Sequence, residues 1–174
     1  MRNLALPGLA AALAVVAAGC TSTAPEPPAT PAAAKAAPEI EAAYWLNSGP
    51  LTLAGLRGKI VVLEFWATWC PPCKRSIPHL VDLHRKYGER GVVIVSLTDE
   101  ARETVEPFAK ELGMTYAVGG GSKSGAAYDV TGIPHAFLID PAGAIAWEGH
   151  PLQGLDEALE AQLKKTPPRT GGAN

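Results

Sequence analysis

Two cysteines separated by two prolines are the residues of this chain best placed to do chemistry. Cys70 and Cys73 stand in the run FWATWCPPCK, where an apolar stretch ends and a helical pattern begins. At the start of a helix, the thiolate of Cys70 faces unpaired N–H groups and the positive end of the helix dipole, which lowers its pKa. Cys73 follows one turn later, close enough for a disulfide. The spacing predicts a redox pair with Cys70 as the exposed, attacking thiol and Cys73 as the buried, resolving thiol.

The cysteine pair has two alternative interpretations. A zinc site needs further thiolate or imidazole ligands at close spacing, and no second C-x-x-C motif accompanies the pair. A stable disulfide without redox function is the other alternative.

Pro71 suits the first helical position because its φ is already fixed. Neither Pro71 nor Pro72 has an N–H group, so fewer backbone donors face the thiolate.

The elements that must position the pair alternate along the chain. Near-continuous apolar runs indicate strands covered on both faces, and apolar residues at helical spacing indicate amphipathic helices. The predicted strands lie at 60–66, 92–97, 136–139 and 144–147, and the predicted helices carry their apolar residues at 77–87, 105–112 and 155–163. This order predicts an α/β fold, a mixed sheet with helices on both faces.

Local signals add detail to this pattern. We expect Thr104 to cap the second helix, which places Pro107 in its first turn. Asp140 to Gly143 have the chemistry of a type I turn and predict an antiparallel hairpin. The run Gly119 to Ser124 lacks the order of a phosphate-binding loop and is expected to be a flexible loop.

The run FWATWCPPC resembles the thioredoxin superfamily, and more closely the TlpA-like thiol-disulfide oxidoreductases of bacterial envelopes. The resemblance covers about residues 51–163 and includes Pro78 and the loop Gly132-Ile133-Pro134. It implies a thioredoxin fold, in which a mixed central sheet is flanked by helices, with a TlpA-like strand–helix insertion between Glu100 and Val130. It also implies that Pro134 is cis and that its loop aligns the substrate beside the dithiol.

Glu64 interrupts an apolar strand at the place of the buried acid of thioredoxins. A buried carboxylate has a raised pKa and can exchange a proton with Cys73 through water, so Glu64 is a catalytic candidate. The alternative is a strand residue that is exposed or paired with a cation such as Lys59.

Five residues near the cysteines are candidates for contact with substrate. Trp69 is expected to offer an apolar surface to an incoming peptide. The others are Pro71, Pro72, Ile133 and His135. For His135, contact with the thiols or a bound metal and a hydrogen-bonded loop position both remain open.

The ends of the chain predict export. Residues 1–19 form a positive start and an Ala-rich run too short for a membrane span, which predicts a signal peptide. Ala17 to Cys20 resemble a lipobox with Ala where Leu is preferred, so Cys20 is the predicted lipidation site; an ordinary cleaved signal or an uncleaved anchor is the alternative. Residues 20–38 predict a Pro/Ala-rich tether, 39–166 a thioredoxin-like domain, and 167–174 a disordered tail.

The cysteine pair predicts thiol-disulfide exchange, and the resemblance implies an envelope thiol-disulfide oxidoreductase that acts as a reductase. The resemblance implies protein disulfide substrates, of apocytochromes in cytochrome c maturation or of metalloproteins, and a membrane electron donor. We expect a lipid-anchored, periplasm-facing monomer without a cofactor, and Thr21 after the lipobox favours the outer membrane. The net charge of −2 over 174 residues disfavours binding of nucleic acid.

Two alternative functions use the same cysteines. A Cu(I)-delivery module would bind the metal through Cys70, Cys73 and, as a candidate third ligand, His135, although copper chaperones of this superfamily usually carry C-x-x-x-C. A peroxiredoxin-like peroxidase is disfavoured, because Leu63 and Ala67 occupy the places where that family has Pro and Thr.

Overall fold

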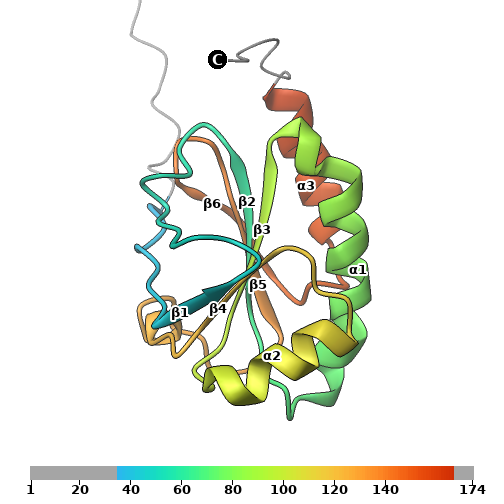
Figure 1. Cartoon of the computed structure of the whole chain (residues 1–174). Helices are drawn as coiled ribbons and strands as arrows, with labels where there is room; N and C mark the ends of the chain where they lie inside the picture. Colours follow the sequence, from blue (N-terminus) through green and yellow to red (C-terminus); the bar gives the residue numbers. More distant parts are fainter. Residues whose placement is uncertain (1–34, 167–174) are drawn as a thin grey trace, which may run out of the picture. The chain divides into compact units, whose positions relative to one another are not determined.

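The β-branched runs form the centre of a six-stranded sheet in the computed structural model, which describes residues 35–166 (Figure 1). The strands are β1 (Tyr44–Leu46), β2 (Ile60–Phe65), β3 (Val92–Leu97), β4 (Ala117–Gly120), β5 (His135–Ile139) and β6 (Ile145–Gly149). Their order across the sheet is β1-β4-β3-β2-β5-β6. The β2–β3 and β3–β4 pairs are parallel, and the other three are antiparallel. The predicted mixed sheet is therefore confirmed.

Three α-helices pack on one face of this sheet. They are α1 (Pro71–Tyr87), α2 (Arg102–Glu111) and α3 (Leu155–Lys165), and short 3-10 turns form η1 (Gly88–Arg90) and η2 (Ser124–Ala126). All three α-helices contribute to a single buried apolar cluster, so the expectation of helices on both faces is wrong. The chain passes from β2 to β3 to β4 in one direction across the sheet, and two right-handed crossovers in one direction place α1 and α2 on the same face.

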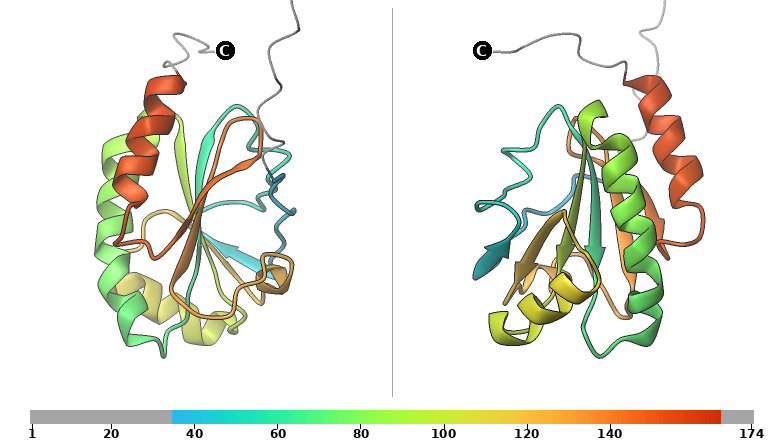
Figure 2. Two further views of the ribbon diagram at one scale, coloured as in Figure 1. Left: turned by 180° about the vertical axis from the view of Figure 1, so that it is seen from behind. Right: turned by 45° about the vertical axis from the view of Figure 1, so that its right-hand side comes forward.

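The opposite face of the sheet is covered by the segment before β2 and by the region around η2. Ile40, Leu53, Leu56 and Tyr128 pack there against the outward side chains of the central strands. Figure 2 shows the blue and teal N-terminal segment on one side of the sheet and the helices on the other. The central strands β2, β3 and β5 are thus buried on both faces, as the apolar runs predict.

The second helix begins earlier than predicted. Its N-cap is Ala101, whose carbonyl oxygen accepts hydrogen bonds from the N–H groups of Thr104 (3.1 Å) and Val105 (3.2 Å). Thr104 is therefore inside α2 and caps nothing. Pro107 also lies in the helix interior.

Gly119 and Gly120 belong to β4 and pair with β1, so the expectation of a flexible loop is wrong for them. Both are buried. A Cβ atom on Gly120 would overlap the Tyr44 ring, so a residue without a side chain is required for β1 to approach.

The predicted hairpin is confirmed. The N–H of Gly143 donates to the carbonyl of Asp140 at 2.8 Å, and the N–H of Ala144 donates to Oδ1 of Asp140, also at 2.8 Å. Gly143 has a φ of 80°, which favours glycine. This turn joins β5 to β6 in antiparallel register.

Contacts of the domain begin before the predicted boundary at residue 39. The N–H of Ile145 donates to the carbonyl of Lys35 at 2.9 Å, and the hydroxyl of Tyr128 donates to the carbonyl of Pro38 at 2.6 Å. The predicted signal peptide at 1–19, the tether up to residue 34 and the tail at 167–174 lie outside the described residues.

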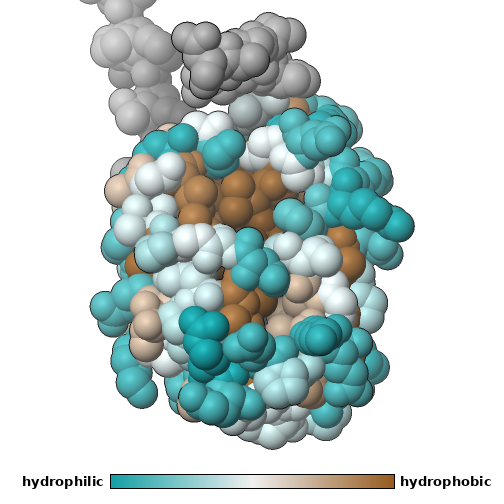
Figure 3. Space-filling view, in the orientation of Figure 1, coloured by the Kyte–Doolittle hydropathy of each residue, from teal (hydrophilic) through white to brown (hydrophobic). Residues whose placement is uncertain are grey.

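The surface of the domain carries both apolar and hydrophilic residues (Figure 3). Apolar residues gather in patches between hydrophilic ones on the face seen in Figure 3. Among the described residues, the large hydrophobic side chains that are exposed belong to Trp69 and Leu152. No helix between residues 35 and 166 has the length and apolar character needed to cross a bilayer.

Candidate active site

The two cysteines of the C-x-x-C motif are joined in a disulfide at the start of α1, with their Cα atoms 5.3 Å apart. Cys70 is the N-cap residue, and its Sγ accepts a hydrogen bond from the N–H of Cys73 at 3.2 Å. The helix therefore places an N–H donor and its positive dipole end at the first sulfur. Pro71 and Pro72 occupy the first two helical positions, so the predicted position of Pro71 is confirmed.

Both cysteines are buried in this oxidised form. The exposed fraction is 2% for Cys70 and 0% for Cys73, so the expectation of an exposed Cys70 is wrong here. The cause is the loop before β5, whose Ile133 carbonyl oxygen lies 3.7 Å from Sγ of Cys70. The peptide bond between Ile133 and Pro134 is cis, which confirms the predicted conformation.

His135 follows the cis-proline as the first residue of β5. It lies opposite Phe65 in the register of β2 and β5, and its ring centroid is 4.9 Å from that of Phe137. The imidazole is therefore packed on an aromatic ring. No cluster of three or more His, Cys, Asp or Glu side chains suited to a metal ion occurs within residues 35–166.

Glu64 is fully buried beneath the active-site helix. Its Oε1 accepts a hydrogen bond from the hydroxyl of Ser76 at 2.9 Å, and its Oε2 accepts one from Ser96 at 2.8 Å. Burial raises the pKa of Glu64 to about 7, although the two hydrogen bonds act in the opposite direction. This burial contradicts the interpretation of Glu64 as an exposed strand residue, and serines rather than Lys59 are its hydrogen-bond partners in the described part of the chain.

Ser76 connects Glu64 with the turn that carries Cys73. Its Oγ lies 2.9 Å from both Oε1 of Glu64 and the carbonyl oxygen of Cys73. The sequence reasoning missed Ser76 and Ser96. Two signals could have found them: Ser76 is three residues after Cys73 on one helix face, and Ser96 lies directly opposite Glu64 in the parallel register of β2 and β3.

A cavity of about 650 Å³ opens beside the dithiol. Trp69, with 70% of its surface exposed, and Ile133 contribute to its walls. Its other apolar lining includes Phe65, Trp66, Leu97 and Val130, and its polar lining includes Thr98, Asp99, Ser122 and Lys123. Of the predicted substrate-contacting residues, Pro71, Pro72 and His135 lie outside this lining. The cavity has the mainly apolar wall and few polar groups that are typical of a binding site.

Comparison with known proteins places this geometry in context. The sequence profile of the AhpC/TSA family matches residues 33–148. Thiol-disulfide oxidoreductase ResA of Bacillus thuringiensis (strain Al Hakam) is 37% identical over 126 residues, which cover 71% of this chain and 72% of the relative.

Solved structures agree with these sequence matches. A candidate thiol:disulfide interchange protein DsbE from Chlorobium tepidum superposes with a TM-score of 0.67 at 25% identity, over 75% of this chain and 96% of that one. A thioredoxin-family thiol:disulfide interchange protein from Chlorobium tepidum TLS gives a TM-score of 0.65 at 27% identity, over 77% of this chain and 99% of that one. The predicted thioredoxin fold is therefore confirmed. In this chain α2, β4 and η2 lie between Glu100 and Val130, where the strand–helix insertion was expected.

Proposed function

We propose that this chain, which belongs to the AhpC/TSA family and is a thioredoxin-like thiol-disulfide oxidoreductase, reduces protein disulfides in a bacterial cell envelope. The observation that carries the proposal is the Cys70–Cys73 disulfide at the N-terminus of α1, facing the cis-Pro134 loop with a buried acid beneath it.

The reaction is a pair of thiol-disulfide exchanges. In the reduced enzyme, the thiolate of Cys70 attacks one sulfur of a substrate disulfide and forms a mixed disulfide, releasing the other substrate sulfur as a thiolate that takes up a proton. Cys73 then loses its proton and attacks Sγ of Cys70, which breaks the mixed disulfide and releases the second substrate thiol. Two electrons pass from the enzyme dithiol to the substrate, and the enzyme ends with the Cys70–Cys73 disulfide.

Glu64 is our candidate for the base in the second exchange. A base works best when its pKa is close to the ambient pH, and burial raises the pKa of Glu64 to about 7. Ser76 lies between this carboxylate and the turn of Cys73. We assign to Glu64 the removal of the Cys73 proton through an intervening water molecule.

Substrate is expected to bind along the cis-Pro134 loop and the neighbouring cavity. Trp69 and Ile133 supply apolar contact there, and His135 follows on β5. We further propose that the clients are disulfides of apocytochromes or metalloproteins, that a membrane electron donor re-reduces the enzyme, and that a lipid on Cys20 holds a periplasm-facing monomer at the membrane.

Trapping of clients tests the mechanism. With Cys73→Ser, the mixed disulfide on Cys70 cannot be resolved, so complexes that run apart after reduction should accumulate in an envelope extract. Cys70→Ser is the matched control and should trap nothing. Absence of complexes with Cys73→Ser would count against the reductase mechanism, and tight Cu(I) binding without reduction of insulin would favour the copper-delivery alternative.

The reduction potential decides the direction of electron flow. A reductase requires a Cys70–Cys73 couple near the roughly −270 mV of thioredoxin, whereas a value near −120 mV is that of a strong oxidant. Equilibration of the protein with defined glutathione or dithiothreitol mixtures gives this value. A potential in the oxidising range would overturn the proposed direction and leave the oxidoreductase activity in place.

A further inference from the structure

The carboxylate of Glu100 holds the loop that precedes the dithiol. Its Oε2 accepts the N–H of Thr68 at 2.7 Å, and its Oε1 accepts the hydroxyl of Thr68 at 2.6 Å. The hydroxyl of Thr98 donates to Oε2 at 3.0 Å. We call this set, Glu100 with Thr68 and Thr98, the Glu100 clamp. It connects the loop between β2 and α1 with the loop after β3.

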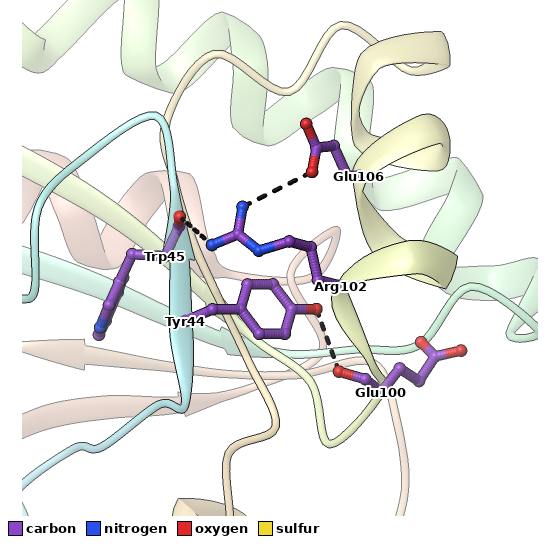
Figure 4. A network of polar contacts seen from close by, with 5 residues as sticks. All are labelled: Tyr44, Trp45, Glu100, Arg102 and Glu106. Carbon is purple, nitrogen blue, oxygen red and sulfur yellow. Dashed lines mark hydrogen bonds and ion pairs between the residues drawn. The ribbon is translucent and has the colours of Figure 1, made fainter.

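The backbone of Glu100 is itself fixed from two sides. Its carbonyl oxygen accepts the hydroxyl of Tyr44 at 3.0 Å and the N–H of Gly121 at 3.0 Å. Figure 4 shows the Tyr44 hydroxyl pointing at Glu100 from β1. The clamp is therefore anchored to the edge of the sheet.

Arg102 supports this anchor. Its guanidinium carbon lies 4.7 Å from the centroid of the Tyr44 ring, and its Nη2 donates to the carbonyl of Trp45 at 3.4 Å (Figure 4). Its Nη1 lies 3.5 Å from the carboxylate of Glu106. These contacts tie the start of α2 to β1 next to Glu100.

The clamp acts on the two residues that follow Thr68. Trp69 is 70% exposed, so little packing against the domain holds it, and the contacts of Thr68 fix the backbone from which its ring projects. Cys70 comes next and caps α1. Two hydrogen bonds from one residue to both oxygens of a carboxylate are charge-assisted and fix orientation as well as distance.

We propose that Glu100 is a positioning residue, which acts through Thr68 to hold Trp69 and Cys70 in the geometry that a protein substrate meets. This inference rests on the proposed reduction of protein disulfides. A protein disulfide must dock on Trp69 and the Ile133 loop before exchange, whereas a small disulfide needs only access to the Cys70 thiolate. The clamp should therefore matter for large substrates and hardly for small ones.

Two rates measured on the reduced full-length enzyme test the proposal, one with insulin and one with glutathione disulfide. Glu100→Gln keeps the side-chain shape but replaces one acceptor oxygen with a donor group, which cannot accept from Thr68. We expect the insulin rate to fall about tenfold, as for other small misplacements of reacting groups, and the glutathione rate to stay within about twofold. Glu103→Gln removes the same charge from an exposed site on α2 and should leave both rates unchanged.

Thr68→Val supplies a second variant in case Glu100→Gln does not fold. It removes one of the two donors and should lower the insulin rate less than Glu100→Gln does. The double variant should be no slower than Glu100→Gln, because the two residues act as one unit. Equal losses on both substrates, unchanged rates, or additive losses in the double variant would each overturn the positioning role. If wild type reduces neither disulfide, the proposed function itself falls, and the inference falls with it.

Discussion

The burial of Glu64 links the protonation of its carboxyl group to the stability of the fold. The carboxyl group has no exposed surface, and its pKa is raised from the ordinary 4.5 to about 7, mainly because burial disfavours the charged form. The folded protein therefore holds this proton more tightly than the unfolded chain does. Between pH values equal to the unfolded and folded pKa of Glu64, about 4.5 and about 7, folding is accompanied by uptake of a proton.

The sign of the pH dependence follows from this proton uptake. Because the folded state binds more protons from about pH 4.5 to about pH 7, the free energy of unfolding falls as pH rises through that window. The loss attributable to Glu64 is on the order of 3 kcal/mol. Glu64→Gln should remove this dependence and make the oxidised protein at least as stable as wild type at about pH 8. Urea unfolding at about pH 5 and about pH 8 measures both proteins.

A surface acid provides the control for this comparison. Glu111→Gln removes an exposed carboxylate at the end of α2 and should keep the wild-type pH dependence. A wild-type stability that does not fall between the two pH values would contradict the burial argument. Glu64→Gln also tests whether Glu64 is the base of the second exchange. If Glu64→Gln exchanges disulfides as fast as wild type from about pH 6 to about pH 9, Glu64 takes no part in proton transfer.

The site residues that could be predicted from the sequence are those marked by a motif or by a break in an apolar run. The cysteine pair is a motif, Pro134 stands in a motif loop, and Glu64 breaks an apolar run. Ser76 and Ser96 belong to no motif, and their spacing from Cys73 and their register opposite Glu64 become informative only once α1 and the β2–β3 pairing are known. The contact of Glu100 with Thr68 joins residues 32 positions apart and depends on the placement of two loops, which no periodicity describes.

Secondary structure was predictable at the level of elements, but their arrangement was less so. The runs 60–66 and 92–97 identified β2 and β3, whereas β1 and β4 are short and were not predicted from an apolar pattern. The glycines of β4 suggested a loop because glycine is common in loops. Gly120 instead leaves room for the Tyr44 ring, and this contact between distant segments cannot be seen in the local sequence. The common face of α1 and α2 follows from crossover handedness only once the strand order is known.

The start of α2 offers a direct test of helix capping. Ala101 is an exposed N-cap residue with extended backbone and no side-chain hydrogen bond. A serine there can accept from the N–H of Thr104 and should raise the free energy of unfolding by about 1 kcal/mol. Ala161→Ser, at an exposed interior position of α3, should instead lower it by up to about 0.5 kcal/mol. Chemical denaturation distinguishes the two, and a gain at both positions would show that the effect is not capping.

The contact between β1 and β4 depends on the absence of a side chain at Gly120. In Gly120→Ala the new Cβ would overlap the Tyr44 ring, which must move and lose its hydrogen bond to the Glu100 carbonyl. We expect a loss of about 2 kcal/mol in the free energy of unfolding, as for other overpacked cores. Gly49→Ala meets no atom within 4 Å and should change little. Equal stability of the two variants would show that β1 can shift without cost.

The candidate active site lies at the carboxyl ends of the parallel strands. The carboxyl ends of the parallel strands β2, β3 and β4 lead into the segments 66–69, 98–99 and 122–123, and all three contribute to the cavity. Ligands of open α/β sheets bind at the carboxyl ends of the strands because loops from neighbouring strands meet there. The dithiol follows β2 and the clamp residue follows β3, so the strand order explains why residues distant in sequence converge.

The proposed attachment of the chain to a membrane through Cys20 should be separable from catalysis, because the dithiol, the buried acid and the cavity all lie within residues 35–166. Because Cys20 is the proposed lipidation site, Cys20→Ser should abolish incorporation of a labelled fatty acid and move the protein from the membrane fraction to the soluble fraction of a bacterial host. Reduction of insulin by the purified full-length variant should equal that of wild type, since insulin is a soluble substrate that no anchor must bring to the enzyme. Wild-type protein without label would refute lipidation. Label that persists in Cys20→Ser would place the lipid on another residue, and a loss of insulin reduction would show that the N-terminal segment contributes to the active site.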